Sequence, residues 1–277
     1  MPTITVFDEM VAAHKPQNAQ QRYSAQQQVM QQIVLAGLYK GGFFEHAAFY
    51  GGTCLRLFYN LPRFSEDLDF SLTGKNPDIH LENYFQAIHD VFALTGKDVV
   101  ITKKDKINFG RVESAFLKED TSAYDIAFQT EKTVKIKFEL DTNPPLLFDT
   151  EQKLLTSPYS MMIRCFTLPD LFAGKMHALV YRNWKMRIKG RDWFDFEWYI
   201  RWNVPLNFSH LQERIREFNG QEITKEEFMH LLREKLSTTD INLVKQDVLP
   251  FVNNPHDLDI WSNEYFGLLA DRLTFTS

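Results

Sequence analysis

The sequence predicts an α+β protein in which a mixed β-sheet flanked by helices is followed by a helical lobe. Residues 133–141, TVKIKFELD, alternate apolar and charged side chains, as a strand with one buried face does. Apolar residues recur at helical spacing from residue 168 nearly to the C-terminus. The change of character near residues 155–167 divides the chain into an expected α/β lobe, residues 1–160, and an expected helical lobe, residues 161–277.

The composition is that of a globular protein. A length of 277 residues suits one domain or two closely packed ones, and 44% hydrophobic with 24% charged residues argues against long disordered segments. A net charge of −5 excludes a uniformly basic surface of the kind that coats nucleic acid. Any nucleic acid would therefore have to meet a local basic patch.

Cysteine usage and hydropathy bound the compartment. The only cysteines, Cys54 and Cys165, lie in apolar stretches, which predicts buried, reduced thiols rather than a disulfide framework. The N-terminal segment MPTITVFDEMVAAHK lacks the basic and apolar regions of a secretory signal, and no run of 18 apolar residues occurs. We therefore expect a cytoplasmic protein with no membrane partner.

The α/β lobe should begin with a helix over residues 20–39, where Val29, Ile33 and Ala36 recur at three- to four-residue steps. Pro62 should end a short helix over 53–60, and Gly96 should end a helix over 79–95. Strands are expected over 46–50, 64–72, from 99 through 107–117, 123–129, 133–141 and 161–166.

The helical lobe should begin at Thr167, a predicted N-cap with Asp170 three residues on. Pro205, Gly220 and Pro255 punctuate the helical pattern that follows. The expected helices span roughly 168–184, 191–202, 207–218, 224–236, 240–250 and 262–273.

Residues 50–70, YGGTCLRLFYNLPRFSEDLDF, carry the most informative pattern. Two carboxylates two residues apart on one face of a strand, Asp67 and Asp69, can hold divalent cations for phosphate chemistry. The Gly51-Gly52 turn lets backbone approach a phosphate without interference from a Cβ atom. The alternative for the two acids alone is a solvent-facing strand edge. A strand over 64–72 would direct Ser65, Asp67, Asp69 and Ser71 to one face and Phe64, Leu68, Phe70 and Leu72 to the core.

Phosphoryl transfer with two metal ions usually needs a third carboxylate. The strand 133–141 offers two candidates, Glu139 and Asp141, on the same face as Lys135 and Lys137. Of the two acids, Glu139 is the stronger candidate, and the register of the strand decides between them. The alternative is an amphipathic strand with alternating surface charge.

The segment 170–199 supplies cations and further acids. Lys175 and Arg182 share a helical face at the border of an apolar stripe, so the Lys175 ammonium would be half sheltered. Asp192 and Asp195 share a face of the next helix. The alternatives are a snorkelling surface lysine for Lys175 and a charge answering the helix dipole for Asp192. An uninterrupted basic run forms a local anion-attracting patch: Lys175, Arg182, Lys185, Arg187, Lys189 and Arg191.

Other conspicuous residues have mainly structural interpretations. His177 does not share a helical face with Lys175 and has no partner at ligand spacing, so we read it as structural. Arg56 could neutralise phosphate or pair with the acids of 66–69, and Arg63 and Ser65 could be structural. Aromatic residues at helical spacing predict packing between helices rather than a base-stacking platform: Trp184, Trp193, Phe194, Phe196, Trp198, Tyr199 and Trp202.

Two motifs carry a family resemblance. Tyr50-Gly51-Gly52, a spacer over 53–66 and Asp67-Leu68-Asp69-Phe70 resemble the minimal nucleotidyltransferase pattern. The longer string GGTxLR…RFSEDLDF is similar to that of AbiEii/AbiGii toxin-like nucleotidyltransferases, relatives of DNA polymerase β in fold. K-x-H-A-x-x-x-R followed by R-D-x-x-D, residues 175–195, resembles downstream motifs of the same family. The resemblance covers most of residues 30–200 and leaves 205–277 without a motif.

The resemblance implies a nucleotidyltransferase lobe, with the helical lobe contributing Lys175 and Asp192 to a cleft. It implies an enzyme that transfers NMP from an NTP to an acceptor hydroxyl with Mg²⁺ or Mn²⁺, bound by Asp67, Asp69 and Glu139. The KIKFEL strand is favoured for the third carboxylate. Implied catalytic residues are Asp67, Asp69, Glu139, Lys175 and Asp192; implied nucleotide-binding residues are Gly51, Gly52, Thr53, Arg56, Lys175 and Arg182.

The biological setting that the resemblance implies is the toxin of a bacterial toxin–antitoxin or phage-defence pair, with tRNA as the leading acceptor and a cognate antitoxin as a possible partner. Two alternatives stay open at this point. One is transfer to a small molecule, and the other is a nucleotide- or partner-binding protein that uses the fold without turnover.

Overall fold

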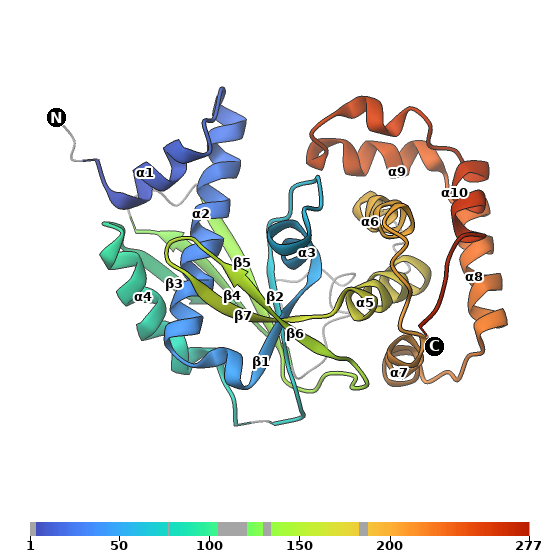
Figure 1. The fold of residues 1–277 in the computed structure, drawn as a ribbon, viewed down its shortest axis with the longest axis horizontal. Coiled ribbons are helices and arrows are strands. Elements are labelled where there is room, and N and C mark those ends of the chain that lie inside the picture. The colour runs from blue at the N-terminus through green and yellow to red at the C-terminus, as the bar shows by residue number, and fades with distance from the viewer. Residues whose placement is uncertain (1–3, 77, 105–120, 130–133, 183–187, 277) are drawn as a thin grey trace. The chain divides into compact units, whose positions relative to one another are not determined.

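A computed structural model describes residues 4–76, 78–104, 121–129, 134–182 and 188–276. The chain forms two compact units (Figure 1). The sheet unit comprises Met1–Phe58, Glu66–Pro144 and Thr150–Cys165. The helical unit comprises Phe166–Ser277 together with two short segments, Tyr59–Ser65 and Pro145–Asp149. The expected strand over 107–117 lies outside the described residues, as do Trp184, Lys185 and Arg187.

A mixed seven-stranded sheet organises the first unit, in the order β3-β4-β5-β2-β1-β7-β6. Strand β2 is central, antiparallel to β1 and parallel to β5. The polar strand β6, TEQKLL, has no clear apolar alternation, and the sequence analysis did not predict it. The strands are β1 Ala47–Tyr50, β2 Leu68–Leu72, β3 Val99–Lys103, β4 Thr121–Phe128, β5 Lys135–Asp141, β6 Thr150–Leu155 and β7 Met161–Phe166.

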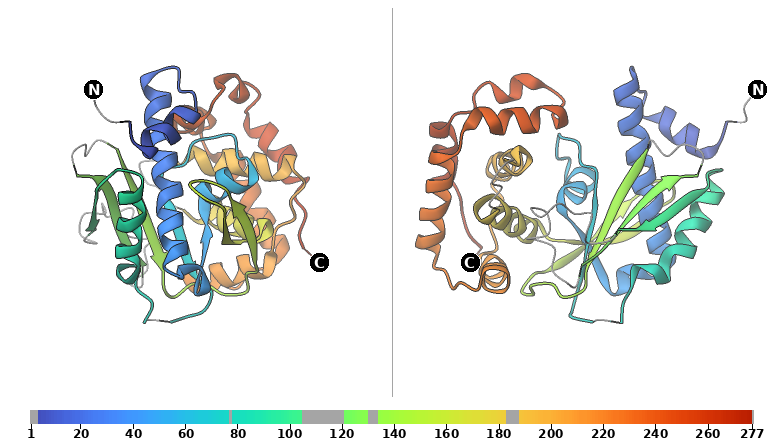
Figure 2. Two further views of the ribbon diagram at one scale, coloured as in Figure 1. Left: turned by 60° about the vertical axis from the view of Figure 1, so that its left-hand side comes forward. Right: turned by 180° about the vertical axis from the view of Figure 1, so that it is seen from behind.

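Helices α2 and α4 pack together on one face of the sheet (Figures 1 and 2). Their closest approach is at Gly37, where an added Cβ would lie 2.6 Å from the Cα of Ile88. Helix α1 was not predicted, although its capping box of Thr5 and Asp8 is visible in the sequence. The helices of this unit are α1 Val6–Ala13, α2 Ala19–Lys40, α3 Gly51–Tyr59, α4 Phe85–Leu94 and the 3₁₀ turns Phe43–Glu45 and Leu81–Tyr84.

The predicted alternation of β5 is confirmed, because Ile136, Phe138 and Leu140 are buried while the charged residues between them are not. Phe138 packs against the rings of Tyr124 and Phe85, and a second group of buried rings lies on β1 and β2. The rings of Phe49 and Phe70, for example, lie 5.2 Å apart between centroids. Burial of these rings fixes the register of the central strands, since a slip of one residue would turn them outward.

The strand predicted over 64–72 is shorter than expected, because β2 begins at Leu68. Asp67 directly precedes the strand, and Phe64 lies outside it at intermediate exposure. The backbone carbonyls of the two residues just before β2 bond to side chains instead of a neighbouring strand. Gln31 Nε2 donates to the carbonyl of Glu66, and Thr53 Oγ1 donates to that of Asp67. Ser71 was predicted on the face of Asp69 and is buried there, where its hydroxyl donates to the carbonyl of Leu72.

The helical unit contains the predicted helices with small shifts of their ends. Pro205 lies between α6 and α7, Gly220 ends α7 in the left-handed region with φ +65°, and Pro255 opens a 3₁₀ turn. Within the described chain, no helix combines the length and apolarity that crossing a membrane requires. The helices are α5 Leu168–Tyr181, α6 Gly190–Arg201, α7 Phe208–Asn219, α8 Lys225–Thr238, α9 Ile241–Val248 and α10 Asn263–Ala270, with 3₁₀ turns at Leu249–Phe251 and Pro255–Leu258.

Thr167 is the N-cap of α5 as predicted, but its side chain bonds differently. Instead of accepting from a helix N–H group, the hydroxyl of Thr167 donates to the buried carboxylate of Asp170. Asp170 also accepts the backbone N–H of Asp149 and the side-chain amide of Asn207. The acid therefore fastens the segment Pro145–Asp149 and helix α7 to the start of α5.

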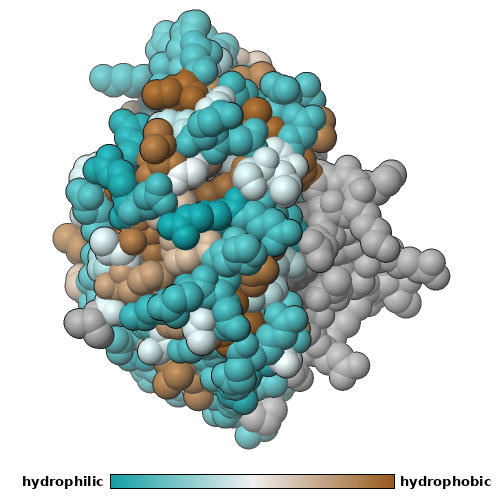
Figure 3. Space-filling view, turned by 90° about the vertical axis from the view of Figure 1, so that its right-hand side faces the viewer, coloured by the Kyte–Doolittle hydropathy of each residue, from teal (hydrophilic) through white to brown (hydrophobic). Residues whose placement is uncertain are grey.

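The aromatic residues of α6 form packing contacts, as predicted, with one exception. Trp193 packs edge-on against Phe266 of α10, and Tyr199 stacks on Phe172 of α5. Trp202 was expected in the core and is 66% exposed, because it is the C-cap where α6 ends. Figure 3 shows the face of the C-terminal helices as mainly hydrophilic, with apolar side chains scattered among polar ones. Scattered apolar residues of this kind are normal for a protein surface.

Candidate active site

The glycine turn lies directly beside one of the two predicted metal ligands. Gly51 has φ +82°, a conformation that favours glycine, and a Cβ added there would overlap the Oδ2 atom of Asp69. Tyr50, the residue before Gly51, stands opposite Asp69 in the β1–β2 ladder. This strand pairing brings the Asp69 side chain against position 51. The turn and the carboxylate are thus one local arrangement.

Gly51, Gly52 and Thr53 form the first turn of α3, two residues earlier than the predicted start of that helix. The first backbone N–H groups of a helix have no partner inside it, which suits them to phosphate. The Thr53 side chain is buried and donates to the carbonyl of Asp67, so it holds the approach to β2 in place. Thr53 can therefore contribute its backbone to a phosphate cradle rather than its hydroxyl.

The third-carboxylate strand lies beside the Asp69 strand. In the parallel pairing of β2 with β5, Asp69 stands opposite Glu139 and Ser71 stands opposite Asp141. Side chains at paired positions of adjacent strands point to the same face, so the carboxylates of Asp69 and Glu139 share a face. Asp141 lies two residues further along and accepts the backbone N–H of Asn143, which closes the turn after β5. The register therefore favours Glu139 over Asp141.

Lys137 is a charged neighbour of these acids to which the sequence analysis gave no role. Its Nζ atom lies 2.5 Å from Oε1 of Glu139. Burial lowers the pKa of Lys137, but the charges of Glu139, Asp67 and Asp69 raise it by more, so the net pKa lies above the ordinary value. The alternation of charge along KIKFELD was the signal that could have identified it, because residues 137 and 139 share a face.

The carboxylate oxygens of this face supply some, but not all, of the ligands that a hard divalent cation needs. Oε1 of Glu139 is buried and has no hydrogen-bond donor of proper geometry, despite the nearby ammonium. Within the described ranges, no three Asp, Glu, His or Cys side chains are gathered tightly enough to hold a metal ion by themselves. Mg²⁺ typically uses one or two carboxylates with substrate phosphates and water, so Asp69 and Glu139, with Asp67 just before β2, fit that mode of binding.

A second group of predicted residues lies within the helical unit. Lys175 of α5 places its Nζ atom 2.7 Å from Oδ2 of Asp195 and 3.5 Å from Oδ1 of Asp192. Arg182, the C-cap of α5, reaches Oδ2 of Asp192 at 3.4 Å. The predicted helical face of Lys175 and Arg182 is therefore directed at the acids of α6, and the Lys175 side chain is 17% exposed.

Arg63 completes this group and was missed as a partner. Its Nε and Nη2 atoms each lie 2.6 Å from an oxygen of Asp195, a bidentate contact in which the Asp195 side chain is fully buried. Arg63 also donates from Nη1 to the carbonyl of Phe64. Asp195 is thus held by two cations, and it positions the Lys175 ammonium beside Asp192.

The cations keep both acids ionised. Burial raises the pKa of Asp192, but Lys175, Arg182, Lys189 and Arg63 lower it by more, to about 2. Burial likewise raises the pKa of Asp195, and Arg63 and Lys175 overcome that effect, so its pKa lies below the usual range. The group therefore carries alternating fixed charges, which can hold a lysine ammonium in one orientation.

Two further predicted residues have structural contacts. Arg56 donates from Nη2 to the side-chain carbonyl of Gln28 at 2.7 Å. His177 is buried, and its Nε2 atom lies 2.9 Å from Oδ1 of Asn219. Burial lowers the pKa of His177 to about 3, with Arg214 adding to the effect, so the ring is neutral near pH 7. These contacts agree with the structural interpretation of His177.

Known proteins with related sequences and folds share this architecture. A profile of the family described as "Nucleotidyl transferase AbiEii toxin, Type IV TA system" matches residues 33–264. MenT4, a nucleotidyltransferase toxin from Mycobacterium tuberculosis, has a similar structure with a TM-score of 0.60 at 15% identity, covering 95% of this chain and 87% of MenT4. No curated protein matches the sequence significantly.

Two structures from Helicobacter pylori show weaker similarity. A putative nucleotidyltransferase aligns with a TM-score of 0.47 at 19% identity, covering 88% of this chain and 90% of its own. The protein JHP933 aligns with a TM-score of 0.49 at 18% identity, covering 95% and 89% respectively.

The mixed sheet with its glycine turn and acidic strand is that of a nucleotidyltransferase, and the predicted fold class and enzyme class are confirmed. More narrowly, the chain belongs to the AbiEii family of nucleotidyltransferase toxins, which is a family of type IV toxin–antitoxin systems. The match extends to residue 264, well beyond the motifs that carry the resemblance in the sequence.

Proposed function

We propose that this protein transfers a nucleoside monophosphate from a nucleoside triphosphate to a hydroxyl group of RNA, with tRNA as the leading acceptor. The acceptor oxygen would attack the α-phosphorus, the bond to the bridging oxygen would break, and pyrophosphate would leave. The acceptor proton would pass to a carboxylate, for which Glu139 is our candidate. A bound Mg²⁺ or Mn²⁺ would neutralise charge on the triphosphate and on the attacking oxygen.

The observation that carries this proposal is the placement of Asp69 between the glycine turn and Glu139. A Cβ at Gly51 would overlap the Asp69 carboxylate, and Asp69 and Glu139 are paired residues of adjacent parallel strands. A phosphate bound by the first turn of α3 would therefore lie close to the acids that hold its metal. We assign Asp67 and Asp69 to metal binding with Glu139, and Gly51, Gly52 and Thr53 to the phosphates.

We assign the group in the helical unit to charge neutralisation. Lys175 would neutralise charge that develops on the phosphates, and Asp192 would orient Lys175 with help from Asp195. The 2.7 Å contact of Lys175 with Asp195 and the charges around Asp192 support this assignment. Arg182 would add a second positive charge for the nucleotide.

The family and the charge distribution support the biological setting. We propose a toxin whose activity a cognate antitoxin opposes, with phage defence as one setting, because the family is one of toxin–antitoxin systems. The net charge is −5, so RNA would have to meet the local cations of residues 175–191 rather than the whole surface.

Transfer can be tested by incubating the protein with total RNA, Mg²⁺ and each α-³²P-labelled triphosphate. We expect wild-type protein to label RNA, and Asp69→Asn to reduce labelling at least about 100-fold, because the site loses a metal ligand without losing the shape of the side chain. Asp90→Asn, at an exposed position of α4, is the matched control and should label normally.

Two results would count against the proposal. Label appearing only in small molecules would replace RNA with a small-molecule acceptor. Equal labelling by wild type and Asp69→Asn would show that the metal site is wrongly assigned. Lys175→Met in the same assay should reduce the turnover number, and unchanged turnover would remove Lys175 from the reaction.

A further inference from the structure

The helical unit contains a pocket that shares Arg182 and Asp192 with the group described above and whose other residues have no assigned role. Its volume is about 330 Å³, and helices α5, α6, α8 and α9 form its walls. Apolar side chains line part of it, including Leu179 and Leu243, and the remainder is polar. Such a volume is at the lower end of the range for small-molecule sites, so it has room for one nucleotide unit rather than an oligonucleotide.

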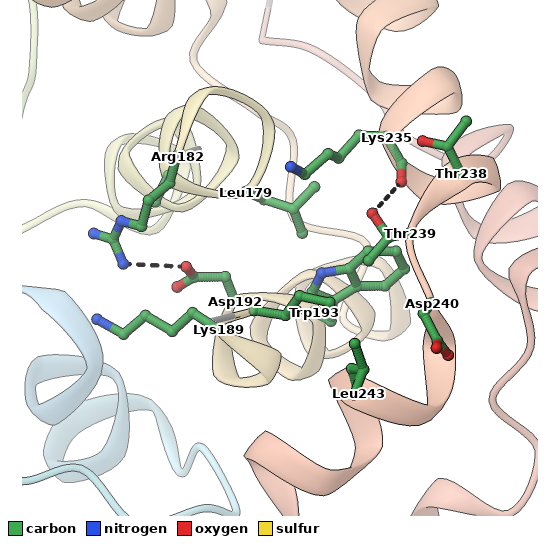
Figure 4. Close-up of a pocket in the computed structure, with 12 residues that line it drawn as sticks. Leu179, Arg182, Lys189, Asp192, Trp193, Lys235, Thr238, Thr239, Asp240 and Leu243 are labelled. Atoms are coloured by element: carbon green, nitrogen blue, oxygen red, sulfur yellow. Dashed lines mark hydrogen bonds and ion pairs between the residues drawn. The ribbon is translucent and has the colours of Figure 1, made fainter. Parts of the chain in front are cut away.

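Two donors of this pocket, on Trp193 and Lys235, have no acceptor among the residues that the structure describes. Trp193 is only 2% exposed and lines the pocket, yet its indole N–H makes no hydrogen bond within the part of the chain that the structure describes. Figure 4 shows the Trp193 nitrogen and the ammonium of Lys235 directed into the same space beside Leu179. Lys235 makes no ion pair with any described residue, whereas the charge of Lys189 interacts with that of Asp192. Donors that line a pocket and have no acceptor among the described residues are available to a ligand that supplies one.

The charge of the pocket favours an anion. Its cations are Arg182, Lys189 and Lys235, and its acids are Asp192 and Asp240. Asp192 is already shared by Lys175 and Arg182, and the Asp240 carboxylate accepts the N–H of Asn242 and points away from Lys235 (Figure 4). Burial lowers the pKa of Lys189 to about 8, with Arg182 adding to the effect, and an anion beside it would raise that pKa again.

We propose that this pocket binds a phosphorylated mononucleotide unit, with Lys235 and the Trp193 N–H as donors to the phosphate and Leu179 and Leu243 against the nucleoside. In the reaction proposed above, this unit would be the terminal nucleotide of the acceptor, and that identification alone rests on the proposed function. Arg182 and Lys189 supply the positive potential that draws the phosphate in.

Binding is tested without turnover, by calorimetric titration of the intact protein in EDTA with AMP, CMP, GMP or UMP, with the corresponding nucleosides, and with inorganic phosphate. At least one monophosphate should bind at least tenfold more tightly than its nucleoside and than phosphate alone. Lys235→Met should weaken that binding at least tenfold, Lys235→Arg should restore most of it, and Lys225→Met, an exposed lysine of the same helix, should leave it unchanged.

Equal binding of nucleoside and monophosphate would overturn the phosphate assignment, equal binding of inorganic phosphate would overturn the nucleoside assignment, and an unchanged affinity in Lys235→Met would place the ligand elsewhere. Asp69→Asn should retain full binding, because the pocket does not include the proposed metal ligands. Normal RNA labelling with no mononucleotide binding would remove the pocket and leave the proposed function intact; binding without labelling would do the reverse.

Discussion

At the scale of single residues, the candidate site depends on which atoms are allowed to approach one another. Glycine at position 51 permits the Asp69 carboxylate to lie where any other side chain would place a Cβ. On the neighbouring strand, Glu139 stands opposite Asp69, and its buried Oε1 atom lies against the Lys137 ammonium. These two contacts are the local basis for expecting a metal-bound phosphate at this point.

Gly51→Ala should therefore impair transfer while the protein still folds. The added methyl group would displace the Asp69 carboxylate, and a displacement of about 1 Å can cost on the order of 100-fold in rate. The measurement is the turnover number for label transfer, with circular dichroism to confirm the fold. Gly267→Ala is the control, because nothing lies within 4 Å of a Cβ at that helical position. Full activity in Gly51→Ala would show that Asp69 does not need its present position.

Buried histidines give a second residue-scale prediction. Burial holds the pKa of both His177 and His210 at about 3, against an ordinary value of about 6.5. Below pH 6.5 the unfolded chain binds protons that the native state does not, so stability falls as the pH is lowered toward 3. Between pH 6.5 and pH 5, each buried histidine should lower the free energy of unfolding by about 1.5 kcal/mol.

His177→Gln should remove one of these contributions. Urea unfolding at the two pH values should show a smaller loss of stability for this variant than for wild type, by about 1.5 kcal/mol. His230→Gln, at an exposed position of α8, serves as the control and should keep the wild-type loss. The same loss in His177→Gln as in wild type would mean that the buried ring can accept a proton.

At the scale of elements, short connections do more than join helices and strands. The segment Tyr59–Ser65 leaves α3 and is fastened to α6 through Arg63, whose guanidinium contacts both oxygens of Asp195. Asp195 in turn contacts Lys175 of α5. The orientation of the lysine therefore depends on an arginine more than one hundred residues away in the sequence.

Arg63→Met should destabilise the protein by about 3–5 kcal/mol, because it leaves a fully buried carboxylate with one of its two cations. Unfolding in urea measures the loss. Arg216→Met is the matched control: its ion pair with Glu213 is 52% exposed on the arginine side, so its removal should leave the free energy of unfolding nearly unchanged. Comparable losses in the two variants would mean that the buried pair contributes no more than a surface pair.

Elements with strong periodicity or strong stop signals could be predicted, and others could not. The alternation in β5 was sufficient to predict that strand, because burial of one face dictates it. The apolar spacing of α2 was sufficient to predict a helix, although residues 29–38 are buried on every side. The start of β2 was misjudged, since the carbonyls of residues 66 and 67 are bound by side chains of Gln31 and Thr53 far away in the sequence. Strand β6 was missed because it is polar, and α1 was missed although its capping box is local.

At the scale of the whole molecule, the sequence motifs are divided between two units. The glycine turn, Asp67, Asp69 and Glu139 belong to the sheet unit, and Lys175, Arg182 and Asp192 belong to the helical unit. Motif spacing predicted both groups, and the family match extends over both. Motif spacing did not predict the contacts of Arg63 and Lys137 or the pocket beside Trp193. These features depend on which helices and strands become neighbours after folding.

The central claim is that Asp69 and Glu139 together bind the metal of a triphosphate held at the glycine turn. The most direct test is a crystal structure of the protein with Mn²⁺ and a non-hydrolysable nucleoside triphosphate, read by the anomalous scattering of manganese. We predict a manganese peak within roughly 2–2.5 Å of an oxygen of each acid, with triphosphate oxygens completing its coordination. A manganese peak on the triphosphate that lies away from both Asp69 and Glu139 would contradict the account.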